Sequence, residues 1–343
     1  MSGTSLDGLD LALCRFCNEN GSWTYDILKA TTIPYEEDWL NILQKLPGTD
    51  ALNLAMVNAS YGRWIGKACN QFLMDQPEKP RLIASHGHTV FHRPAEGMTL
   101  QIGSGAAIAA ETGLTTICDF RSLDVSLGGH GAPLVPIGDK LLFGQFDACV
   151  NIGGFANLSY NSGNQRVAWD ICPANFLLNR EAARLGLKMD ESGKIARSGM
   201  LDESLLQELN SLDYYLHKGP KSLGREWVEL HMLPIIEKNG SDSATILRTL
   251  TEHIAFQVSK ALPEKPGGVA LFTGGGAHNH FLMERISQQS RLKTVIPDNE
   301  TIDFKEALIF AFLGVLRITN QHNCLAEVTG ASRDNCGGAL YQP

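Results

Sequence analysis

The chain opens with MSGTSLDGLD, in which Gly3 and Gly8 have the spacing of a phosphate-binding loop. A P-loop would continue with Lys and then Ser or Thr, but Leu9 and Asp10 follow instead. Without a lysine, an anion held here needs backbone N–H groups, hydroxyls and a metal ion as partners. Asp7 is the natural Mg²⁺ ligand, and the predicted phosphate contacts are Gly3, Thr4, Ser5, Leu6, Asp7 and Gly8. An ordinary hairpin turn is the alternative, because Ser, Asp and Gly all favour turns.

Two further glycine turns follow later in the chain. Gly153 and Gly154 separate DACVNI from FANLSYN, two runs that are typical of strands. The run GGGAHN, with Gly274, Gly275 and Gly276, lies between a predicted strand and a predicted helix. Backbone N–H groups in such bends make concave anion sites. Two glycine bends between strands, instead of the strand-to-helix turn of a Rossmann domain, predict two facing clamps that suit a triphosphate and its nucleoside. For the third turn, tight packing without a ligand is the alternative.

Asp170 is the candidate general base. It ends the predicted strand RVAWD just before a predicted helix, where a carboxylate can project into a cleft and accept a proton from water. The alternative is a carboxylate that only stabilises the start of the helix. His86, His88 and His92 could suggest a metal site, but no carboxylate or cysteine lies close in sequence to complete one. Hydrogen bonding to hydroxyl groups is therefore the preferred role of these imidazoles.

Composition excludes several classes of protein. The chain has 343 residues, of which 43% are hydrophobic and 19% charged, and its net charge is −8. Because no run of Lys and Arg appears, neither nucleic acid nor a membrane surface is expected as the main partner. The first twenty residues lack a signal-peptide core, and the apolar run ALIFAFLGVL is too short for a bilayer. Cys14 and Cys17 form a single C-x-x-C, interpreted as buried reduced thiols. These features predict a cytoplasmic protein.

The predicted strands and helices that must position these residues follow a similar order in the two halves of the chain. Strands are predicted at LDLALCRF and WTYDILKATTIPY, helices at 36–46 and 50–74, and strands again at RLIASHG and TTICDF. Near residue 145 the order restarts with DACVNIGG, FANLSYN and RVAWD, followed by the helix in PANFLLNREAARLG and the strand in GGVALFT. The sequence therefore predicts an α/β protein with domains at 1–140 and 141–343, the last segment packing back on the first domain.

Seven strings carry a resemblance to a known family: MSGTSLDGLD, SHGHTVFHRP, CDFRSLDVSLGGHGAPLVP, NIGGFANLS, WDICPAN, GPKSLGRE and LFTGGGAHN. In this order, over nearly the whole chain, they resemble the anhydro-N-acetylmuramic acid kinases of the sugar-kinase, Hsp70 and actin superfamily. The resemblance implies two RNase H-like (actin/hexokinase-type) domains with an interdomain active-site cleft. It also implies ATP and Mg²⁺ as cofactors, hydrolytic opening of a 1,6-anhydro sugar with phosphorylation of O6, a role in peptidoglycan recycling, and a homodimer.

The resemblance also implies roles for individual residues. Asp170 matches the catalytic aspartate, Arg121 suits the lactyl carboxylate of the sugar, and Asn157 joins the ATP contacts. The expected substrate contacts are His88, Thr89, Arg121, His130 and Glu306. Relatives often have glutamine at the positions of His88 and His130.

The chain also departs from the family at a predicted turn and at its beginning. Cys172 and Ala174 occupy positions that are often glycine, which predicts a less close approach of this backbone to the ligand. Relatives carry a strand ahead of the first turn, whereas here the chain begins at Met1, so the first clamp is expected to lack a sheet neighbour. Two other functions remain open at this stage: an ordinary sugar kinase of the same fold, or an actin- or Hsp70-like ATP switch.

Overall fold

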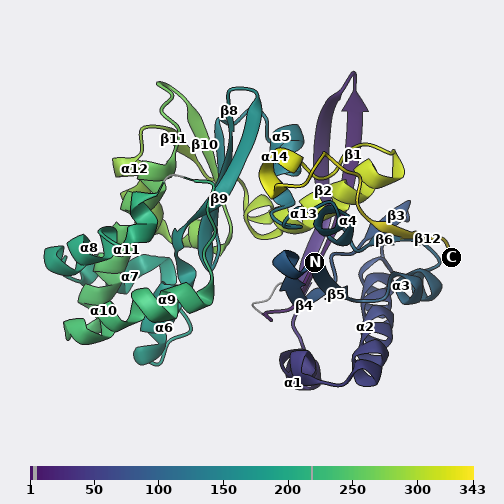
Figure 1. Ribbon diagram of the computed structural model, residues 1–343, viewed down its shortest axis with the longest axis horizontal. Coiled ribbons are helices and arrows are strands. Elements are labelled where there is room, and N and C mark those ends of the chain that lie inside the picture. The colour runs from purple at the N-terminus through teal and green to yellow at the C-terminus, as the bar shows by residue number, and fades with distance from the viewer. Residues whose placement is uncertain (3–5, 218) are drawn as a thin grey trace. The chain divides into compact units, whose positions relative to one another are not determined.

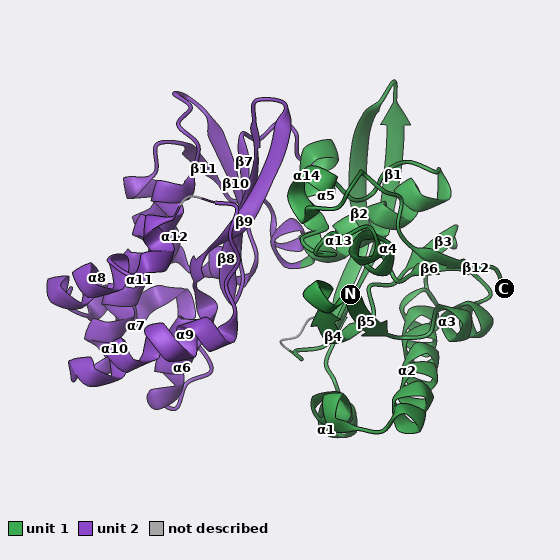
Figure 2. Ribbon diagram, viewed as in Figure 1, with its two compact units in different colours: residues 1–142, 304–343 green, residues 143–303 purple. Residues whose placement is uncertain are grey.

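In this computed structural model the chain divides into two compact units, and the structure describes residues 1–2, 6–217 and 219–343. Unit 1 comprises residues 1–142 and 304–343, and unit 2 comprises residues 143–303 (Figure 1, Figure 2). The end of the chain therefore belongs to the same unit as its beginning. The mixed α/β class expected from the sequence is confirmed.

Unit 2 is built on a five-stranded mixed sheet in the order β11-β10-β7-β8-β9. Its strands are β7 (Ala148–Ile152), β8 (Phe155–Ser162), β9 (Gln165–Pro173), β10 (Val269–Thr273) and β11 (Lys293–Val295). β7, β8 and β9 form an antiparallel meander, whereas β10 is parallel to β7 and β11 is parallel to β10. Numbered by appearance and taken from the β9 edge, the order is 3-2-1-4-5, as expected of an RNase H-like domain.

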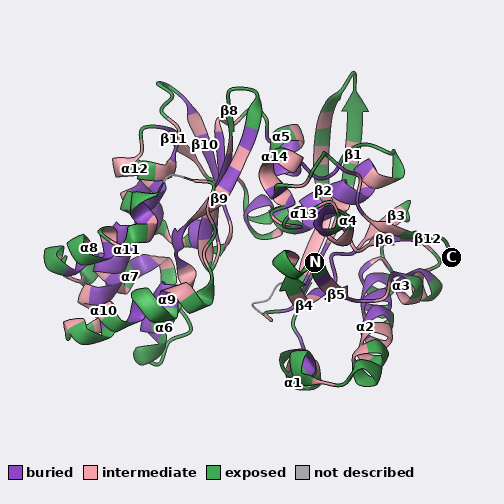
Figure 3. Cartoon of the chain, viewed as in Figure 1, coloured by how far each residue is buried: buried purple, intermediate pink, exposed green. Residues whose placement is uncertain are grey.

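The helices of unit 2 gather around α11 (Ser243–Ala261), which contacts β9 and four other helices. Asp242 begins this helix by accepting hydrogen bonds from the N–H groups of Ala244 and Thr245, an N-cap arrangement. Ile246, Leu250 and Ile254 lie in its buried stripe (Figure 3). The other helices are α6 (Asn175–Arg184), α7 (Lys194–Ser198), α8 (Glu203–Asn210), α9 (Arg225–His231), α10 (Leu233–Asn239) and α12 (His280–Gln289).

Unit 1 has three small sheets in its described residues instead of one continuous sheet. β1 (Leu9–Glu19) pairs with β2 (Ser22–Ile33), and β3 (Leu82–Ala84) pairs with β6 (Thr115–Cys118). β12 (Ala339–Tyr341) adds to the other edge of β6, which brings the end of the chain into this sheet. β4 (His88–Arg93) and β5 (Met98–Ile102) form a separate hairpin.

The residues of the turn explain why β1 and β2 form a long hairpin. Asn20 and Gly21 connect the strands and both have positive φ, at 53° and 88°. An Asn-Gly pair adopts these angles at little cost, and the resulting turn matches the twist of the strands. The Gly21 N–H also donates to Asn18 Oδ1. On β1, Cys17 is exposed, so the expectation that both thiols of the C-x-x-C are buried is wrong for this one.

The helices of unit 1 enclose a core in which Tyr35, Trp39, Tyr61 and Trp64 pack their rings together. These helices are α1 (Glu37–Lys45), α2 (Ala51–Phe72), α3 (Gly105–Thr112), α4 (Ser122–Ser126), α5 (Val135–Leu142), α13 (Asn299–Ile318) and α14 (Ala326–Thr329). From Phe304 onward α13 belongs to unit 1. Among the described residues, no helix is both long enough and apolar enough to span a bilayer.

Candidate functional site

In unit 2, two glycine turns meet at one edge of the sheet. β7 and β10 are parallel neighbours, with Asn151 opposite Thr273, so the turns that follow them begin side by side. Gly153 and Gly154 follow β7, and Gly274 to Gly276 follow β10. The carboxyl ends of parallel strands are where α/β sheets bind ligands. The two turns that the sequence assigned to phosphate and nucleoside are therefore brought together.

The turn after β10 needs glycine for packing. Gly274 has φ of +81°, and a Cβ placed there would lie 2.5 Å from Asn151 Oδ1. A Cβ at Gly276 would collide with the Ile152 side chain, whereas at Gly275 the nearest atom would be Asn175 Nδ2 at 3.7 Å. Gly274 and Gly276 thus let this turn press against the end of β7, and Gly275 remains exposed. Asn279 caps the helix that follows by accepting from Leu282 N–H.

The turn after β7 also organises the start of α6. The N–H groups of Ala174 and Phe176 donate to the Gly154 carbonyl, and that of Asn175 donates to the Gly153 carbonyl. Gly154 is exposed, a Cβ there would meet no atom within 4 Å, and its N–H donates to no acceptor among the described residues. An unused backbone N–H at such a turn can donate to an anionic oxygen.

A row of polar side chains crosses the sheet beside these turns. Strand pairing places Thr273 opposite Asn151, Asn151 opposite Asn157, and Asn157 opposite Asp170. Side chains of directly paired residues point to the same face of a sheet. The three from Asn151 to Asp170 are half-buried, while their strand neighbours Ile152, Ala156 and Ile171 are buried on the opposite face. The row therefore joins the predicted base to the predicted nucleotide turns.

Asp170 is held firmly but keeps one oxygen available. Its Oδ2 accepts the Leu223 N–H at 2.9 Å, and its backbone carbonyl accepts the Tyr214 hydroxyl at 2.5 Å. Its Oδ1 has no hydrogen-bond partner among the described residues. Burial raises the pKa of this carboxyl, and the Leu223 N–H opposes part of that rise. The result is an oriented carboxylate with a raised proton affinity and one oxygen that can accept a proton.

Sequence reasoning missed several groups that build this part of the site. Asn151 was not singled out, although a polar residue in the otherwise apolar strand DACVNI was the signal. The string GPKSLGRE contributed to the family resemblance, but no role was predicted for any of its residues. In the structure, Lys221 Nζ donates to the Tyr214 and His217 carbonyls and lies 4.0 Å from the Tyr214 ring centroid. This lysine holds the loop whose Leu223 N–H orients Asp170.

Arg121, in unit 1, is positioned by His86. Its Nε donates to His86 Nε2 at 3.0 Å, and its NH1 donates to the Gly131 carbonyl at 2.6 Å. Burial, with the neighbouring Arg121 charge, holds the pKa of His86 well below its ordinary value, so the imidazole is neutral and can accept this bond. His86 Nδ1 donates to the Gly87 carbonyl, which sets the tautomer. Neither of these contacts of Arg121 is an ion pair with an aspartate.

His88 and Thr89 lie at the start of β4. His88 is buried, with Nδ1 3.2 Å from Ser2 Oγ, and burial lowers its pKa. Ser2 Oγ is in turn 2.6 Å from the Tyr35 hydroxyl. Thr89 Oγ1 accepts from Gln101 Nε2 at 3.4 Å. Both predicted sugar contacts therefore belong to polar networks inside unit 1.

His130 and Glu306 complete the predicted sugar contacts in unit 1. The His130 side chain is exposed, and the backbone N–H of His130 donates to the Thr329 carbonyl. The loop that carries it is tied down by buried Asp124, whose carboxylate accepts from Gly131 N–H and from side chains of the C-terminal segment. Glu306 lies within α13, which begins at Asn299, and not ahead of the helix as expected. The surrounding protein raises the pKa of Glu306, and the Arg121 charge lowers it in part.

The opening turn is only partly within the described residues. Gly3, Thr4 and Ser5 lie outside them, so the predicted contacts at these residues stay predictions. Leu6 packs against the core of unit 1, and a Cβ at Gly8 would lie 2.5 Å from the Ile33 carbonyl oxygen. Asp7 is exposed and makes no hydrogen bond or ion pair among the described residues. An available exposed carboxylate fits the oxygen ligands that Mg²⁺ prefers.

The two residues that replace the usual glycines of the family are both buried. Cys172 lies near the end of β9, and Ala174 precedes α6, with each side chain inside the core of unit 2. Ala174 has φ of −125° and ψ of −99°. The turn forms with residues other than glycine at both positions.

Comparison with known proteins agrees with the resemblance. The chain matches the family described as anhydro-N-acetylmuramic acid kinase over residues 1–343. The protein of that name from Pseudomonas savastanoi pv. phaseolicola is 35% identical over 371 residues, covering 99% of this chain and 97% of that one. The one from Cyanothece sp. (strain PCC 7425) is 36% identical over 373 residues, covering 99% and 98%. A solved activator of 2-hydroxyisocaproyl-CoA dehydratase from Clostridium difficile with bound ADPNP overlaps 59% of this chain and 79% of that one, with 15% identity and a TM-score of 0.32, too little for any argument. From the match over its full length and these relatives, the chain belongs to the anhydro-N-acetylmuramic acid kinase family and is a kinase.

Proposed function

We propose that this kinase uses ATP and water to convert 1,6-anhydro-N-acetylmuramic acid into N-acetylmuramic acid 6-phosphate, a step in peptidoglycan recycling. Family membership supports the substrate, and the environment of Asp170 is the single observation that carries the hydrolytic step. The proposal includes a cytoplasmic location, which was predicted from features of the sequence, and a homodimer, which rests on the family resemblance alone.

In the proposed reaction, Asp170 accepts a proton from the water that attacks the anomeric carbon. The new bond joins the water oxygen to C1, while the bond from C1 to O6 breaks. O6 then attacks the γ-phosphorus of ATP, and ADP leaves. The Leu223 N–H fixes Oδ2 of the carboxylate, so that Oδ1 can face the water. The raised pKa of Asp170 makes this carboxylate a stronger base than an exposed aspartate.

The nucleotide is proposed to bind at the glycine turns. In unit 2, the free Gly154 N–H would donate to a phosphate oxygen, and Asn157 would lie between that turn and Asp170. The turn from Gly274 to Gly276 would pack under the adenine or ribose. Asp7, with the rest of the opening turn from Gly3 to Gly8, would hold Mg²⁺ and phosphate from unit 1. When bound, Mg²⁺ supplies positive charge that compensates the phosphates.

The sugar is proposed to contact residues of unit 1. Arg121 suits the lactyl carboxylate, because His86 and the Gly131 carbonyl already orient its guanidinium group. His88, being neutral, can exchange hydrogen bonds with a hydroxyl group, as can Thr89. His130 and Glu306 complete the proposed set of contacts.

The deciding experiment replaces Asp170 and traces the oxygen of water. Asp170→Asn should fold and bind ATP normally, yet lose at least ~10²-fold in kcat, the lower end for loss of a general base. KM for the sugar should change much less, because the amide can still hydrogen-bond. In oxygen-18-labelled water, the wild-type product should carry the label at C1 and not in the phosphate. Mass spectrometry of the product locates the label.

A matched control is Asp75→Asn, which changes an exposed aspartate in the loop after α2 and should leave kcat unchanged. Near-normal turnover by Asp170→Asn would remove the assigned base. Label in the phosphate would mean that water attacks ATP, and the protein would then be an ATPase of the same fold. Equal turnover of a free sugar without the anhydro ring would identify an ordinary sugar kinase.

A further inference from the structure

The proposed transfer moves a group that carries several negative charges, so a fixed cation beside it is expected. Sites that transfer phosphoryl groups combine a metal ion with a Lys or Arg side chain near the γ-phosphate. Asp7 accounts for the metal in the proposed function, but the opening stretch MSGTSLDGLD contains no lysine or arginine. The cation should therefore come from another part of the chain.

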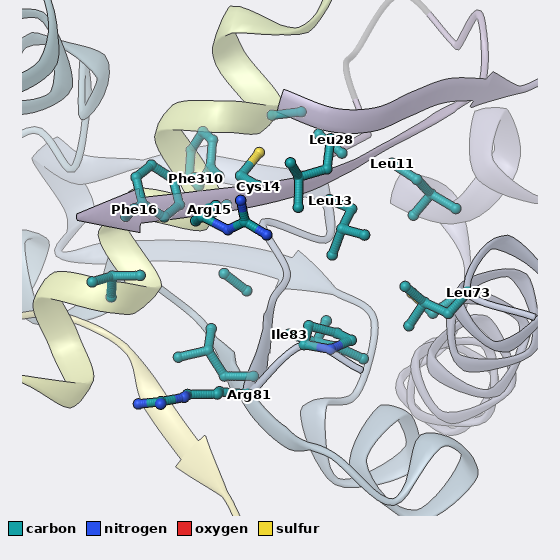
Figure 4. A pocket seen from close by; sticks show the side chains of 18 of the residues that line it. Leu11, Leu13, Cys14, Arg15, Phe16, Leu28, Leu73, Arg81, Ile83 and Phe310 are labelled. Atoms are coloured by element: carbon teal, nitrogen blue, oxygen red, sulfur yellow. The ribbon is translucent and has the colours of Figure 1, made fainter. Parts of the chain in front are cut away.

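Two arginines of unit 1 are poor candidates for this cation. Figure 4 shows Arg15 and Arg81 at a groove of about 760 Å³ between β1 and β3. Leu11, Leu13 and Ile83 line this groove, and apolar side chains offer no hydrogen bonds to a polyphosphate. A cation that acts beside Asp170 and the two later glycine turns is therefore expected in unit 2, to which they belong.

The string GPKSLGRE forms the loop that holds Asp170. The Asp170 N–H donates to the Lys221 carbonyl at 3.0 Å, and the Leu223 N–H donates to Asp170 Oδ2 at 2.9 Å. Arg225 follows two residues after Leu223, as the first residue of α9. The backbone of Arg225 is thereby tied to the position of the proposed base.

The Arg225 side chain is also connected to the glycine turn after β7. Its guanidinium carbon is 5.6 Å from the centroid of the Phe176 ring, within the range of a cation–π contact. The Phe176 ring stacks on that of Phe155, with the two centroids 5.9 Å apart. Phe155 directly follows Gly154, and the Phe176 N–H donates to the Gly154 carbonyl. This stack therefore connects the guanidinium group to the turn that offers the free Gly154 N–H.

Part of the guanidinium group is available for a ligand. Its Nε donates to Glu229 Oε1 at 2.7 Å, whereas NH1 and NH2 have no acceptor among the described residues. The Arg225 side chain is 69% exposed. Lys221, the other cation in GPKSLGRE, already donates to two backbone carbonyls. Arg225 is therefore the side chain of this string that can donate two parallel hydrogen bonds to phosphate oxygens.

We propose that Arg225 contacts the γ-phosphate of ATP through NH1 and NH2 and stabilises the transferred phosphoryl group. During transfer the bond from O6 to phosphorus forms. The bond from phosphorus to the oxygen shared with the β-phosphate breaks, and its electron pair leaves with ADP. Negative charge is then spread over the other three oxygens of the group, where a fixed guanidinium is most effective. This role rests on the proposed function, to which it adds a catalytic residue.

The first test measures how much the γ-phosphate contributes to nucleotide affinity in the full chain. Because Arg225 and the two later glycine turns belong to unit 2, the contact should form without the sugar. Calorimetry with Mg²⁺ compares ADP with a non-hydrolysable ATP analogue. Arg225→Ala should bind the analogue about 10-fold more weakly than wild type, because hydrogen bonds to a charged group are lost. Its affinity for ADP should stay close to that of wild type.

The second test is the kinase assay with the same variants. Arg225→Ala should lose at least ~10²-fold in kcat, as when one donor to a developing charge is removed. Arg225→Lys keeps the charge and the packing on Phe176 but cannot donate two parallel hydrogen bonds. Its kcat should therefore lie between those of wild type and the alanine variant.

Two controls separate this role from ion pairing on the surface. Glu229→Gln removes the negative charge that pairs with Arg225, but its amide oxygen can still accept from Nε. Its kcat and its affinity for the analogue should stay close to those of wild type, because exposed ion pairs contribute little. Arg180→Ala removes another partly exposed arginine of unit 2, which pairs with Glu237 at 2.7 Å, and should leave both quantities unchanged.

Two results would overturn the proposal. One is equal weakening of ADP and of the analogue in Arg225→Ala. The other is a loss of kcat in Glu229→Gln as large as in Arg225→Ala, because the ion pair within α9 would then be what matters.

Failure of this role and failure of the proposed function give different results. If labelled oxygen from water entered the phosphate, O6 would not be the acceptor, yet the selective loss of analogue affinity in Arg225→Ala would still be expected. If the label stayed at C1 while Arg225→Ala bound the analogue and turned over like wild type, only the role of Arg225 would be lost.

Discussion

At the scale of single residues, Asp170 combines two properties that oppose each other. Burial raises its pKa and makes it a better proton acceptor, but burial also makes the carboxylate costly in the folded state. The hydrogen bond from the Leu223 N–H stabilises the charged carboxylate in part and fixes its orientation. In the proposed role of general base, Asp170 would gain proton affinity at the expense of stability.

We therefore predict that Asp170→Asn is at least as stable as wild type near neutral pH. Because the folded-state pKa is raised, the folded protein binds the Asp170 proton more tightly than the unfolded chain does. The stabilisation from that proton is complete below the unfolded pKa and is lost as pH rises through the folded pKa. The Asn variant should thus have the higher Tm at pH 7, and the difference should vanish near pH 3. Calorimetry across this range measures it, and a Tm well below wild type at pH 7 would contradict the prediction.

Asp7 presents the opposite case, an exposed carboxylate without a described partner. Asp7→Ala should change the free energy of unfolding by no more than about 0.5 kcal/mol, as for other surface substitutions. Half-saturation by Mg²⁺ in the kinase assay should need on the order of 10–100-fold more metal, because a ligand is lost. Asp26→Ala, at another exposed aspartate in unit 1, is the control. Wild-type activity across a Mg²⁺ titration of the Asp7 variant would remove it from the metal site.

At the scale of elements, the turn after β10 contains one glycine that packs against the core, Gly276, and one that is exposed, Gly275. Gly276→Ala should cost about 1–3 kcal/mol, because its Cβ would collide with Ile152 in a packed core. Gly275→Ala should stay within about 0.5 kcal/mol of wild type, since Gly275 is exposed. If this turn packs under the nucleotide, Gly275→Ala should nevertheless raise KM for ATP. Denaturant unfolding and ATP titration distinguish the two effects, and a Gly276→Ala variant as stable as wild type would show that packing against β7 does not require Gly276.

At the scale of the whole molecule, the proposed site draws on both units: Asp170 and two glycine turns from unit 2, and the sugar contacts and opening turn from unit 1. Reaction on one bound sugar then requires the units to act on the same ligand and to exclude water from the phosphates. We predict that a non-hydrolysable ATP analogue together with the sugar lowers the radius of gyration measured by solution scattering. Either ligand alone should have a smaller effect. No change at saturating concentrations of both would contradict closure.

The sequence by itself determined the order of strands, helices and glycine turns, because these depend on short-range features. Alternating apolar residues predict β1, a continuous apolar run predicts β7, and Gly153 and Gly154 mark a bend. The side chain of Asn279 caps the helix that follows it. The family and its expected catalytic aspartate could also be inferred from the sequence, because seven short strings typical of the family occur in the same order. These predictions need no knowledge of which distant segments touch.

Only the tertiary structure decided which of these residues meet. The row from Thr273 through Asn151 and Asn157 to Asp170 depends on pairing registers between strands, of which β7 and β10 are far apart in the chain: Asn151 pairs with Thr273. The Leu223 N–H that orients Asp170 comes from a loop without regular periodicity, and the groove between β1 and β3 is visible only when both strand edges are located. A one-residue change of register would turn Asp170 to the opposite face of its sheet. The turn at Gly163 and Asn164 sets the register of β9 on β8 locally, whereas the pairing of β10 with β7 joins strands that are far apart in the chain.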